Sequence, residues 1–262
     1  MPVEELPNFK DWLFDRDRDL ELQSFTRAEV LTGDWQPLVE EAKKQLDGFK
    51  GRLGIHGPFW GIPIDSMDPD VRTVVSTRML QGLEVCEALD ATHMVIHSPY
   101  NAWMYNNFPA LPTWIANADE RVHDTLAPAV KRAEEIGTTI VLENIEDKDP
   151  HARVNLAASF GSDAVAVSVD TGHAELSRHM CGAPPPDHFI RAAGSRLAHV
   201  HIQDIDGYGD RHWQIGTGCI AWHGVFEALS TIDANPRLVL ELKDYTKIMP
   251  SMAFLEREGL GQ

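Results

Sequence analysis

The feature that most constrains this chain is a repeated pair of segments, a short apolar run rich in β-formers followed by a longer segment of helical period. Seven such runs occur, at residues 19–25, 52–56, 92–97, 138–143, 164–170, 197–203 and 237–242. Helical periods lie between them at residues 35–49, 70–89, 117–136, 187–193 and 222–232. Strands that alternate with helices in this way are joined by crossover connections and run parallel. The pattern predicts an α/β fold built on a parallel sheet.

Seven runs spread over 262 residues indicate a TIM-type (β/α) barrel. Barrels of this kind have eight strands and about 250 residues in one domain, so a single domain is predicted over residues 1–262. The first run is preceded by 18 residues, of which Asn8 to Phe14 are more typical of a helix than of a strand. The barrel is therefore predicted to be eight-stranded or to lack its first strand, with seven strands visible.

The charge balance bears on the partners of the protein. Lys and Arg together number 23 against 40 Asp and Glu, which gives a formal net charge of −17. A field of this sign repels polyanions, so nucleic acid is disfavoured as a partner.

The distribution of apolar residues and cysteines bears on the compartment. No stretch approaches the roughly 20 apolar residues that span a bilayer, and the first residues lack the basic and apolar regions of a secretion signal. We therefore expect a cytoplasmic protein with no membrane partner. Cys86, Cys181 and Cys219 are odd in number and lack the paired spacing of a metal site, which predicts buried free thiols.

Polar residues interrupt the apolar runs in a consistent phase. In the run at 138–143, Ile140 and Leu142 point one way, so Glu143 lies on the opposite face. The same alternation, applied to the other runs, turns six polar residues toward the barrel interior: His56, His97, Glu143, Asp170, His201 and Glu241. All six stand at the carboxyl ends of their runs, the edge on which parallel barrels build active sites.

Each of these residues taken alone has an ordinary explanation, as a helix cap or a hydrogen-bonded core group. Six converging together cannot all be caps. Burying three carboxylates without compensation is prohibitive, and a divalent cation is the usual remedy. The sequence therefore predicts a metal centre.

The motifs around these residues resemble the xylose-isomerase-like barrel superfamily. They are GIHGPF at 54–59, MVIHSPYN at 94–101, VLENIED at 141–147, VDTGH at 169–173, HVHIQDIDGYGDRHWQIGTG at 199–218 and LVLELKD at 238–244. That superfamily contains sugar isomerases and epimerases, related dehydratases and the endonuclease IV class of abasic-site nucleases. The resemblance runs in order from about Asp19 to Asp244, and it is specific for fold and metal but only weakly so for substrate.

The resemblance to the ketose epimerase branch implies one divalent metal ion held by four residues: Glu143, Asp170, His201 and Glu241. It also implies that Glu143 and Glu241 act as paired acid and base. Manganese, cobalt or magnesium suits three carboxylates and one imidazole. The implied activity is that of a sugar or sugar phosphate isomerase or epimerase working through an enediolate.

The endonuclease IV branch implies more ligands, for three zinc ions, and this sequence contains candidates for all nine. They are His56, His97, Glu143, Asp170, His173, His201, Asp210, His212 and Glu241. In sugar-acting relatives the extra residues hold substrate or structure instead. For His56, His97, His173, Asp210 and His212 both roles, substrate binding or additional metal binding, stay open.

The loops that follow the second and third runs bear on the choice between sugar and nucleic acid. Residues 57–71 and 98–120 contain no Lys or Arg, but they do carry Trp60, Tyr100, Trp103, Tyr105 and Trp114. A nuclease must grip phosphates with basic groups or helix N-termini, whereas aromatic faces over a carboxylate-rich centre suit a sugar or another polyol. Trp60 and Trp103 are predicted to bind substrate, against the plain alternative that these aromatics pack the loops. Arg211 is predicted to contact a substrate oxygen or phosphate, although an exposed arginine is the ordinary explanation.

The sequence thus favours a divalent-metal-dependent sugar isomerase or epimerase. An endonuclease IV-like zinc phosphodiesterase acting on abasic DNA is the first alternative. A non-catalytic barrel that binds a polyol, or a subunit of a larger enzyme, is the second. The family resemblance also suggests a homo-oligomer, a dimer.

Overall fold

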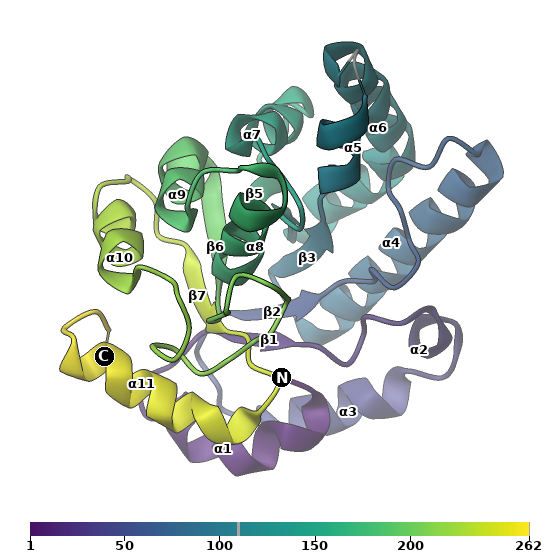
Figure 1. Ribbon diagram of the computed structural model, residues 1–262. Coiled ribbons are helices and arrows are strands. Elements are labelled where there is room, and N and C mark those ends of the chain that lie inside the picture. Colours follow the sequence, from purple (N-terminus) through teal and green to yellow (C-terminus); the bar gives the residue numbers. More distant parts are fainter. Residues whose placement is uncertain (109–110, 262) are drawn as a thin grey trace. The chain divides into compact units, whose positions relative to one another are not determined.

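Seven parallel strands form one sheet in the computed structural model, which describes residues 1–108 and 111–261. The strands follow one another in sequence order across the sheet, from β1 to β7 (Figure 1). Their bounds are Leu20–Leu22 (β1), Leu53–His56 (β2), His93–His97 (β3), Thr139–Glu143 (β4), Val165–Asp170 (β5), Leu197–Ile202 (β6) and Arg237–Leu240 (β7). The predicted fold class and its seven visible strands are confirmed, and the order is that of consecutive β/α units.

The helices lie between the strands. Their bounds are Leu6–Phe14 (α1), Ala28–Thr32 (α2), Gln36–Gln45 (α3), Pro69–Leu89 (α4), Ala102–Asn107 (α5), Leu111–Ile136 (α6), Pro150–Ser159 (α7), Thr171–Cys181 (α8), Pro186–Ala193 (α9), Trp222–Ser230 (α10) and Ile248–Arg257 (α11). The helix expected at Asn8 to Phe14 is present as α1. None of the helices in the described part of the chain is both long and apolar enough to cross a membrane.

Local sequence signals explain where two of the longer helices begin and end. Asp68 caps the N-terminus of α4 by accepting a hydrogen bond from Asp70 N at 2.8 Å, and Pro69 occupies the first turn. Asp90 ends this helix in the left-handed conformation, with φ 55°. Gly182 does the same for α8, with φ 74°.

Several helices lie in segments for which the sequence predicts none. Helix α5 lies in the aromatic segment after β3, where a loop is expected, and α8 follows β5 with no intervening turn. Tyr100 from the same aromatic segment is 1% exposed, so it is a core residue and not the rim aromatic that the sequence indicated. Because α7 and α8 lack a strong apolar stripe at helical spacing in sequence, periodicity alone could not place them.

The chain divides into two compact units. The first comprises residues Met1–Pro99, Pro112–Leu142 and Phe160–Val165, and the second comprises Tyr100–Leu111, Glu143–Ser159 and Ala166–Gln262. In the first unit β1 pairs with β2 and β2 with β3, while α1 packs on α3 and α4 packs on β3. The single domain expected over residues 1–262 stays a prediction.

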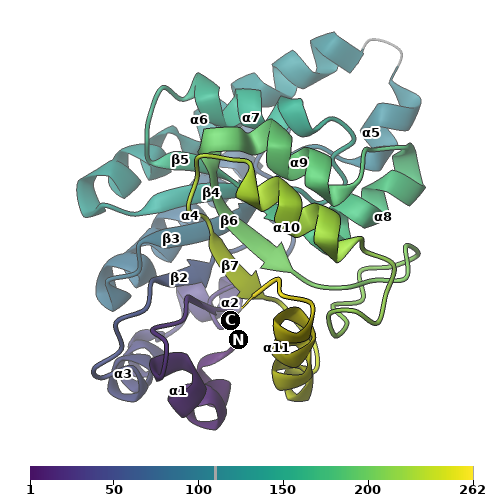
Figure 2. The same ribbon diagram turned by 90° about the vertical axis from the view of Figure 1, so that its left-hand side faces the viewer.

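The second unit contains most of β5 and all of β6 and β7. There β5 pairs with β6, which places Asp170 opposite His201, and β6 pairs with β7. Helices α7, α9 and α10 pack in succession, and α9 and α10 lie side by side (Figure 2). Leu197, Val200 and Ile202 of β6 are at most 2% exposed, so this strand is buried as parallel strands are.

The last strand is shorter than the sequence predicted. It ends at Leu240, so Glu241 lies one residue beyond β7, although its backbone N–H still donates to Ile202 O at 3.1 Å. Leu238, expected on the covered apolar face, is 39% exposed. The apolar run therefore marks the strand correctly but overstates both its length and its burial.

The connection from β6 to α10 is organised by the buried carboxylate of Asp204, which is 0% exposed. Its Oδ1 accepts hydrogen bonds from Ile205 N at 3.0 Å and Ile220 N at 3.3 Å. Its Oδ2 accepts from Gly216 N at 2.8 Å and Trp222 Nε1 at 3.1 Å. A methyl group at Gly218 would lie 2.3 Å from Asp204 Oδ1, so this glycine lets the loop wrap closely around the carboxylate.

We predict that Asp204→Ala lowers the free energy of unfolding by about 3–5 kcal/mol, because four donors lose a buried charged acceptor. Trp222→Phe removes one of these donors and should cost about 1 kcal/mol beyond any packing change. Denaturant unfolding of both variants measures the difference. Equal stability of Asp204→Ala and the parent chain would contradict this role.

Candidate metal centre

Four side chains predicted as metal ligands come together in the second unit. One donor atom each from Glu143, Asp170, His201 and Glu241 lies within 4.8 Å of the other three. His201 Nδ1 is 2.8 Å from Glu143 Oε1, 3.4 Å from Glu241 Oε2 and 3.9 Å from Asp170 Oδ2. The side chains of Glu143, Asp170 and His201 are at most 1% exposed, and that of Glu241 is 11% exposed. The group is thus two buried carboxylates and one partly buried carboxylate around one imidazole.

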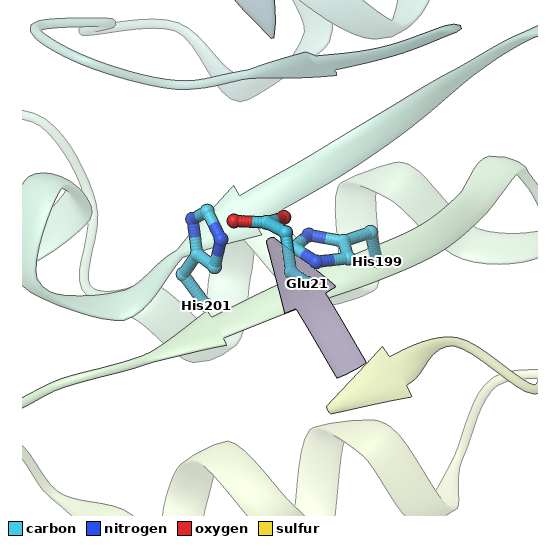
Figure 3. A group of neighbouring side chains, drawn as sticks. All are labelled: Glu21, His199 and His201. Atoms are coloured by element: carbon cyan, nitrogen blue, oxygen red, sulfur yellow. The ribbon is translucent and has the colours of Figure 1, made fainter. Parts of the chain in front are cut away.

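Strand alternation sets which face of β6 carries the imidazole. His199 and His201 stand two residues apart on β6, and Figure 3 shows both side chains rising from that strand. His199 is a core histidine: it is 1% exposed, and its Nδ1 lies 2.9 Å from the Ser168 hydroxyl. His201 reaches the carboxylates instead because it stands nearer the carboxyl end of the strand.

Asp170 is held by its neighbours at the start of α8. Its backbone N–H donates to Asn144 Oδ1 at 2.8 Å, and its carbonyl accepts from Asn144 Nδ2 at 3.0 Å. Its side chain caps the helix by accepting from His173 N at 2.6 Å. Asp170 therefore acts as a helix cap and a cluster member at once, two roles that are alternatives when only the sequence is considered.

Gln203 also belongs to this centre, although no sequence pattern predicted it. Its Nε2 donates to both carboxylate oxygens of Asp170, at 3.1 and 3.2 Å, and to Asp210 Oδ1 at 3.1 Å. Its Oε1 accepts from His212 N at 2.9 Å. Space for it exists because residue 172 is glycine: a methyl group there would lie 2.5 Å from Gln203 Cδ. The available signal was a polar residue at the end of the run 197–203, with Gly172 in the VDTGH motif.

A second group of ligand type borders the first. His173, Asp210 and His212 each offer a donor atom within 4.8 Å of the other two. Asp210 lies 3.3 Å from His173 Nε2 and 2.8 Å from His212 Nε2. His173 Nδ1 is also 3.5 Å from Glu143 Oε1, and His212 Nδ1 is 3.5 Å from Glu241 Oε2. The two groups therefore form one continuous array of acids and imidazoles.

The backbone of His212, which belongs to this array, has a strained conformation. Its φ is 52°, in the left-handed region that a residue with a side chain rarely adopts. Such conformations cost about 1–3 kcal/mol and persist only where surrounding contacts impose them. Here the contacts are Gln203 at its N–H and Asp210 at its ring.

Burial and neighbouring charges shift the pKa values in opposite directions. Burial raises the pKa of Asp170 to about 6, with the charges of Glu143 and Glu241 adding to it against the opposing effect of His173. Burial would also raise the pKa of Asp210, but hydrogen bonds from His173 and His212 outweigh it and lower that pKa strongly. Asp170 thus resists ionisation, whereas Asp210 is held ionised.

The two imidazoles of the second group respond to these carboxylates. Burial would lower the pKa of His173, but the charge of Asp170 and the hydrogen bond to Asp210 raise it well above its ordinary value. The pKa of His212 is raised in the same way, by Asp210 and Glu241 against burial. Positive charge is therefore favoured inside this array, whether carried by protons or by a cation.

The donor set fits a divalent cation. Three carboxylates and one imidazole are hard or borderline ligands of the kind that magnesium, manganese and cobalt accept. Glu143 and Asp170 are buried, and burial raises the pKa of Asp170, which indicates that its negative charge is not fully compensated. A cation would supply that compensation.

The other predicted site residues fall into different surroundings. In the first unit, His56 and His97 have ring centroids 5.2 Å apart, and Phe59 stacks on His97 at 4.3 Å. Trp60 and Trp103 are 61% and 63% exposed. Arg211 pairs with Asp206 at 3.1 Å and lies over the Trp213 ring, which matches the plain interpretation of an exposed arginine.

The sequence as a whole identifies the family. Residues 15–258 match the model of the xylose isomerase-like TIM barrel. The chain belongs to this family. An uncharacterised protein of Methanocaldococcus jannaschii is 25% identical over 219 residues, which cover 80% of this chain and 71% of the relative.

Three solved structures extend the likeness. The TTHB071 protein of Thermus thermophilus, soaked with ZnCl2, has a TM-score of 0.77 and 25% identity over 100% of this chain and 97% of its own. A D-tagatose 3-epimerase-like protein has a TM-score of 0.74 and 22% identity, covering 90% and 87%. The D-psicose 3-epimerase of Clostridium cellulolyticum, solved with D-tagatose, has a TM-score of 0.67 and 21% identity, covering 90% and 78%. The last two likenesses show a fold shared with sugar epimerases.

The raised pKa of Asp170 predicts how metal affinity depends on pH. A ligand carboxylate must lose its proton to bind, and with a pKa of about 6 its ionised fraction falls about tenfold between pH 7 and pH 5. We expect the affinity for Mn²⁺ to drop at least about tenfold over this range, measured by calorimetric titration of the chelator-treated protein. A constant affinity would show that Asp170 is not a ligand.

Proposed function

We propose that this protein is a divalent-metal-dependent isomerase or epimerase of a sugar or sugar phosphate, with Glu143 and Glu241 as its acid and base. One observation carries the proposal. The two glutamates come from β4 and from the residue after β7, yet both reach His201 Nδ1, at 2.8 and 3.4 Å. Two carboxylates that enter one site from different strands suit a reaction that removes a proton at one position and returns it at another.

The four residues of the carboxylate cluster would hold the metal ion. Such an ion, when bound, polarises the carbonyl and neighbouring hydroxyl of a ketose and so acidifies the C–H between them. Glu143 or Glu241 then takes that proton, and the other glutamate returns one to the opposite face or to the adjacent carbon. Either outcome passes through an enediolate, so epimerisation and isomerisation need nearly the same side chains.

The second group supplies contacts for a polyhydroxylated substrate. Asp210 stays ionised and fixes the rings of His173 and His212, whose contact with sugar hydroxyls would have to replace a partner that each ring nitrogen already has. The exposed aromatic face of Trp103 suits the apolar side of a sugar ring. That Trp60 and Arg211 contact the substrate stays a prediction. The likeness to solved sugar 3-epimerases supports this substrate class. A cytoplasmic homo-oligomer would fit the same family.

One observation favours a second candidate, an endonuclease IV-like zinc phosphodiesterase acting on abasic DNA. The His173, Asp210 and His212 group lies directly beside the carboxylate cluster, as a multinuclear centre requires. The net charge of −17 opposes it, because a duplex must be gripped through its phosphates. A barrel that binds a polyol without catalysis is the third candidate.

We predict that Glu143→Gln and Glu241→Gln each lower turnover by about 10²–10⁴, because each removes a proton-transfer group while leaving an oxygen ligand. The assay is exchange of substrate C–H for deuterium in D2O, followed by NMR with Mn²⁺ and a panel of ketoses and their phosphates. Glu227→Gln, on α10 and away from the carboxylate cluster, is the matched control and should retain parent activity.

Three outcomes separate the candidates. Near-normal exchange in both glutamine variants at saturating Mn²⁺ sinks the acid and base assignment. Nicking of an abasic-site duplex by the zinc-loaded protein favours the phosphodiesterase, and its absence rejects that activity. Tight binding of metal and polyol with no exchange identifies the non-catalytic barrel.

A further inference from the structure

A third group of metal-ligand type lies in the second unit, apart from the two described above. Glu175, His179 and Cys219 each offer a donor atom within 4.8 Å of the other two. His179 Nε2 is 3.3 Å from Glu175 Oε1. The sequence predicts Cys219 to be a buried thiol, but this prediction is wrong, because Cys219 is exposed. Neither the spacing of the cysteines nor any strand motif singled out this group.

The geometry of α8 and of the following loop explains the convergence. Glu175 and His179 stand four residues apart on α8, so their side chains share one helix face. Cys219 belongs to the loop that wraps around Asp204, and its N–H donates to Ile205 O at 2.8 Å. Because Asp204 also holds Ile220 through a hydrogen bond, the backbone on both sides of Cys219 is fixed. The thiol is therefore presented to α8 by a rigid segment.

The loop also leaves room for the imidazole. Gly207 has φ 80°, and a methyl group there would lie 2.8 Å from His179 Nε2. The Tyr208 ring lies 6.3 Å from the His179 ring, between centroids. The His179 imidazole therefore packs against the backbone of the loop at Gly207, although its side chain is 49% exposed.

The surroundings of the thiol carry negative charge. The Glu175 side chain is only 5% exposed and pairs with Arg178 at 3.2 Å, an arginine that is itself half-exposed. Burial, together with the charges of Glu175 and Asp204, raises the pKa of Cys219. A cation placed here would be attracted by these carboxylates and would displace the thiol proton to solvent.

We infer that Glu175, His179 and Cys219 form a binding site for a zinc-type metal ion that fastens α8 to the loop between β6 and α10. Zinc bonds of roughly 2.0–2.3 Å to these ligand types place tetrahedral donor atoms roughly 3.3–3.8 Å apart. The donor atoms already lie within 4.8 Å of one another, so small side-chain movements complete the site. A water molecule would fill the fourth position.

This ion would act on the loop that carries Asp210 and His212. A bond from Cys219 to a metal held by α8 limits how far that loop can move from the helix that begins with Thr171 and His173. The site would thus stabilise the array of acids and imidazoles without touching substrate. It differs in chemistry from the carboxylate cluster because it contains sulfur.

Cobalt substitution tests the inference in the whole protein. Chelator-treated protein titrated with Co²⁺ should develop a thiolate-to-cobalt charge-transfer band in the near-ultraviolet, with one equivalent of the ion accounting for it. Cys219→Ser should abolish the band. Cys181→Ser is the matched control, because Cys181 is buried and donates its S–H to Ser177 O at 3.2 Å. That variant should keep the band.

Two more variants test the other ligands. His179→Gln and Glu175→Gln should weaken cobalt binding, read from the band, by at least about tenfold, because each removes one of three ligands. Absence of a band at saturating Co²⁺, or its survival in Cys219→Ser, overturns the inference. The band arises whether or not the protein turns over a sugar, so this result is independent of the proposed activity.

Discussion

The constraint on which the rest of this structure depends is the convergence of three carboxylates on one imidazole. Glu143, Asp170 and Glu241 converge on His201, and of these only Glu241 is more than 1% exposed. Charges of one sign repel strongly when water is removed, and burial alone penalises each ionised group. The arrangement is stable only if protons, imidazolium groups or a cation offset the negative charge. The electrostatic penalty of this cluster therefore favours the binding of a cation.

A supporting layer of hydrogen bonds fixes the geometry of these charges. Asn144 clamps the backbone of Asp170 from both sides, and Gln203 holds both of its carboxylate oxygens. Asn144 is itself contacted by the fully buried Arg153, at 3.5 Å, whose Nε donates to Asp147 at 3.1 Å. Polar groups that orient ligands in this way are what keep a site within the tolerance that proton transfer demands.

The loop after β6 brings further side chains of metal-ligand type to the carboxyl end of that strand. Asp204 gathers four backbone and side-chain donors, and this closes the segment that brings Asp210 and His212 to the carboxylates. The same loop brings Cys219 to Glu175 and His179 on α8. The buried carboxylate of Asp204 thereby supports both the array of acids and imidazoles and the group that contains the thiol.

The sequence by itself determined the fold class, the seven strands and the four residues of the carboxylate cluster. It could do so because period-two alternation assigns each strand residue to a face, and because parallel strands bring their carboxyl ends to one edge. Glu143, Asp170 and His201 follow from that rule alone. The helices α5, α7 and α8 did not follow, because their faces lack a regular apolar stripe.

Only the tertiary structure decided which polar residues outside the strands belong to the centre and which lie elsewhere. Gln203 and Asn144 are ordinary polar residues in sequence, and their roles depend on side-chain reach and on the space that Gly172 leaves. Arg211 and Asp210 are neighbours in sequence, yet Arg211 turns to Asp206 while Asp210 turns to the histidines. Loops impose no fixed period on their side chains, so their directions are set by contacts between segments that are distant along the chain.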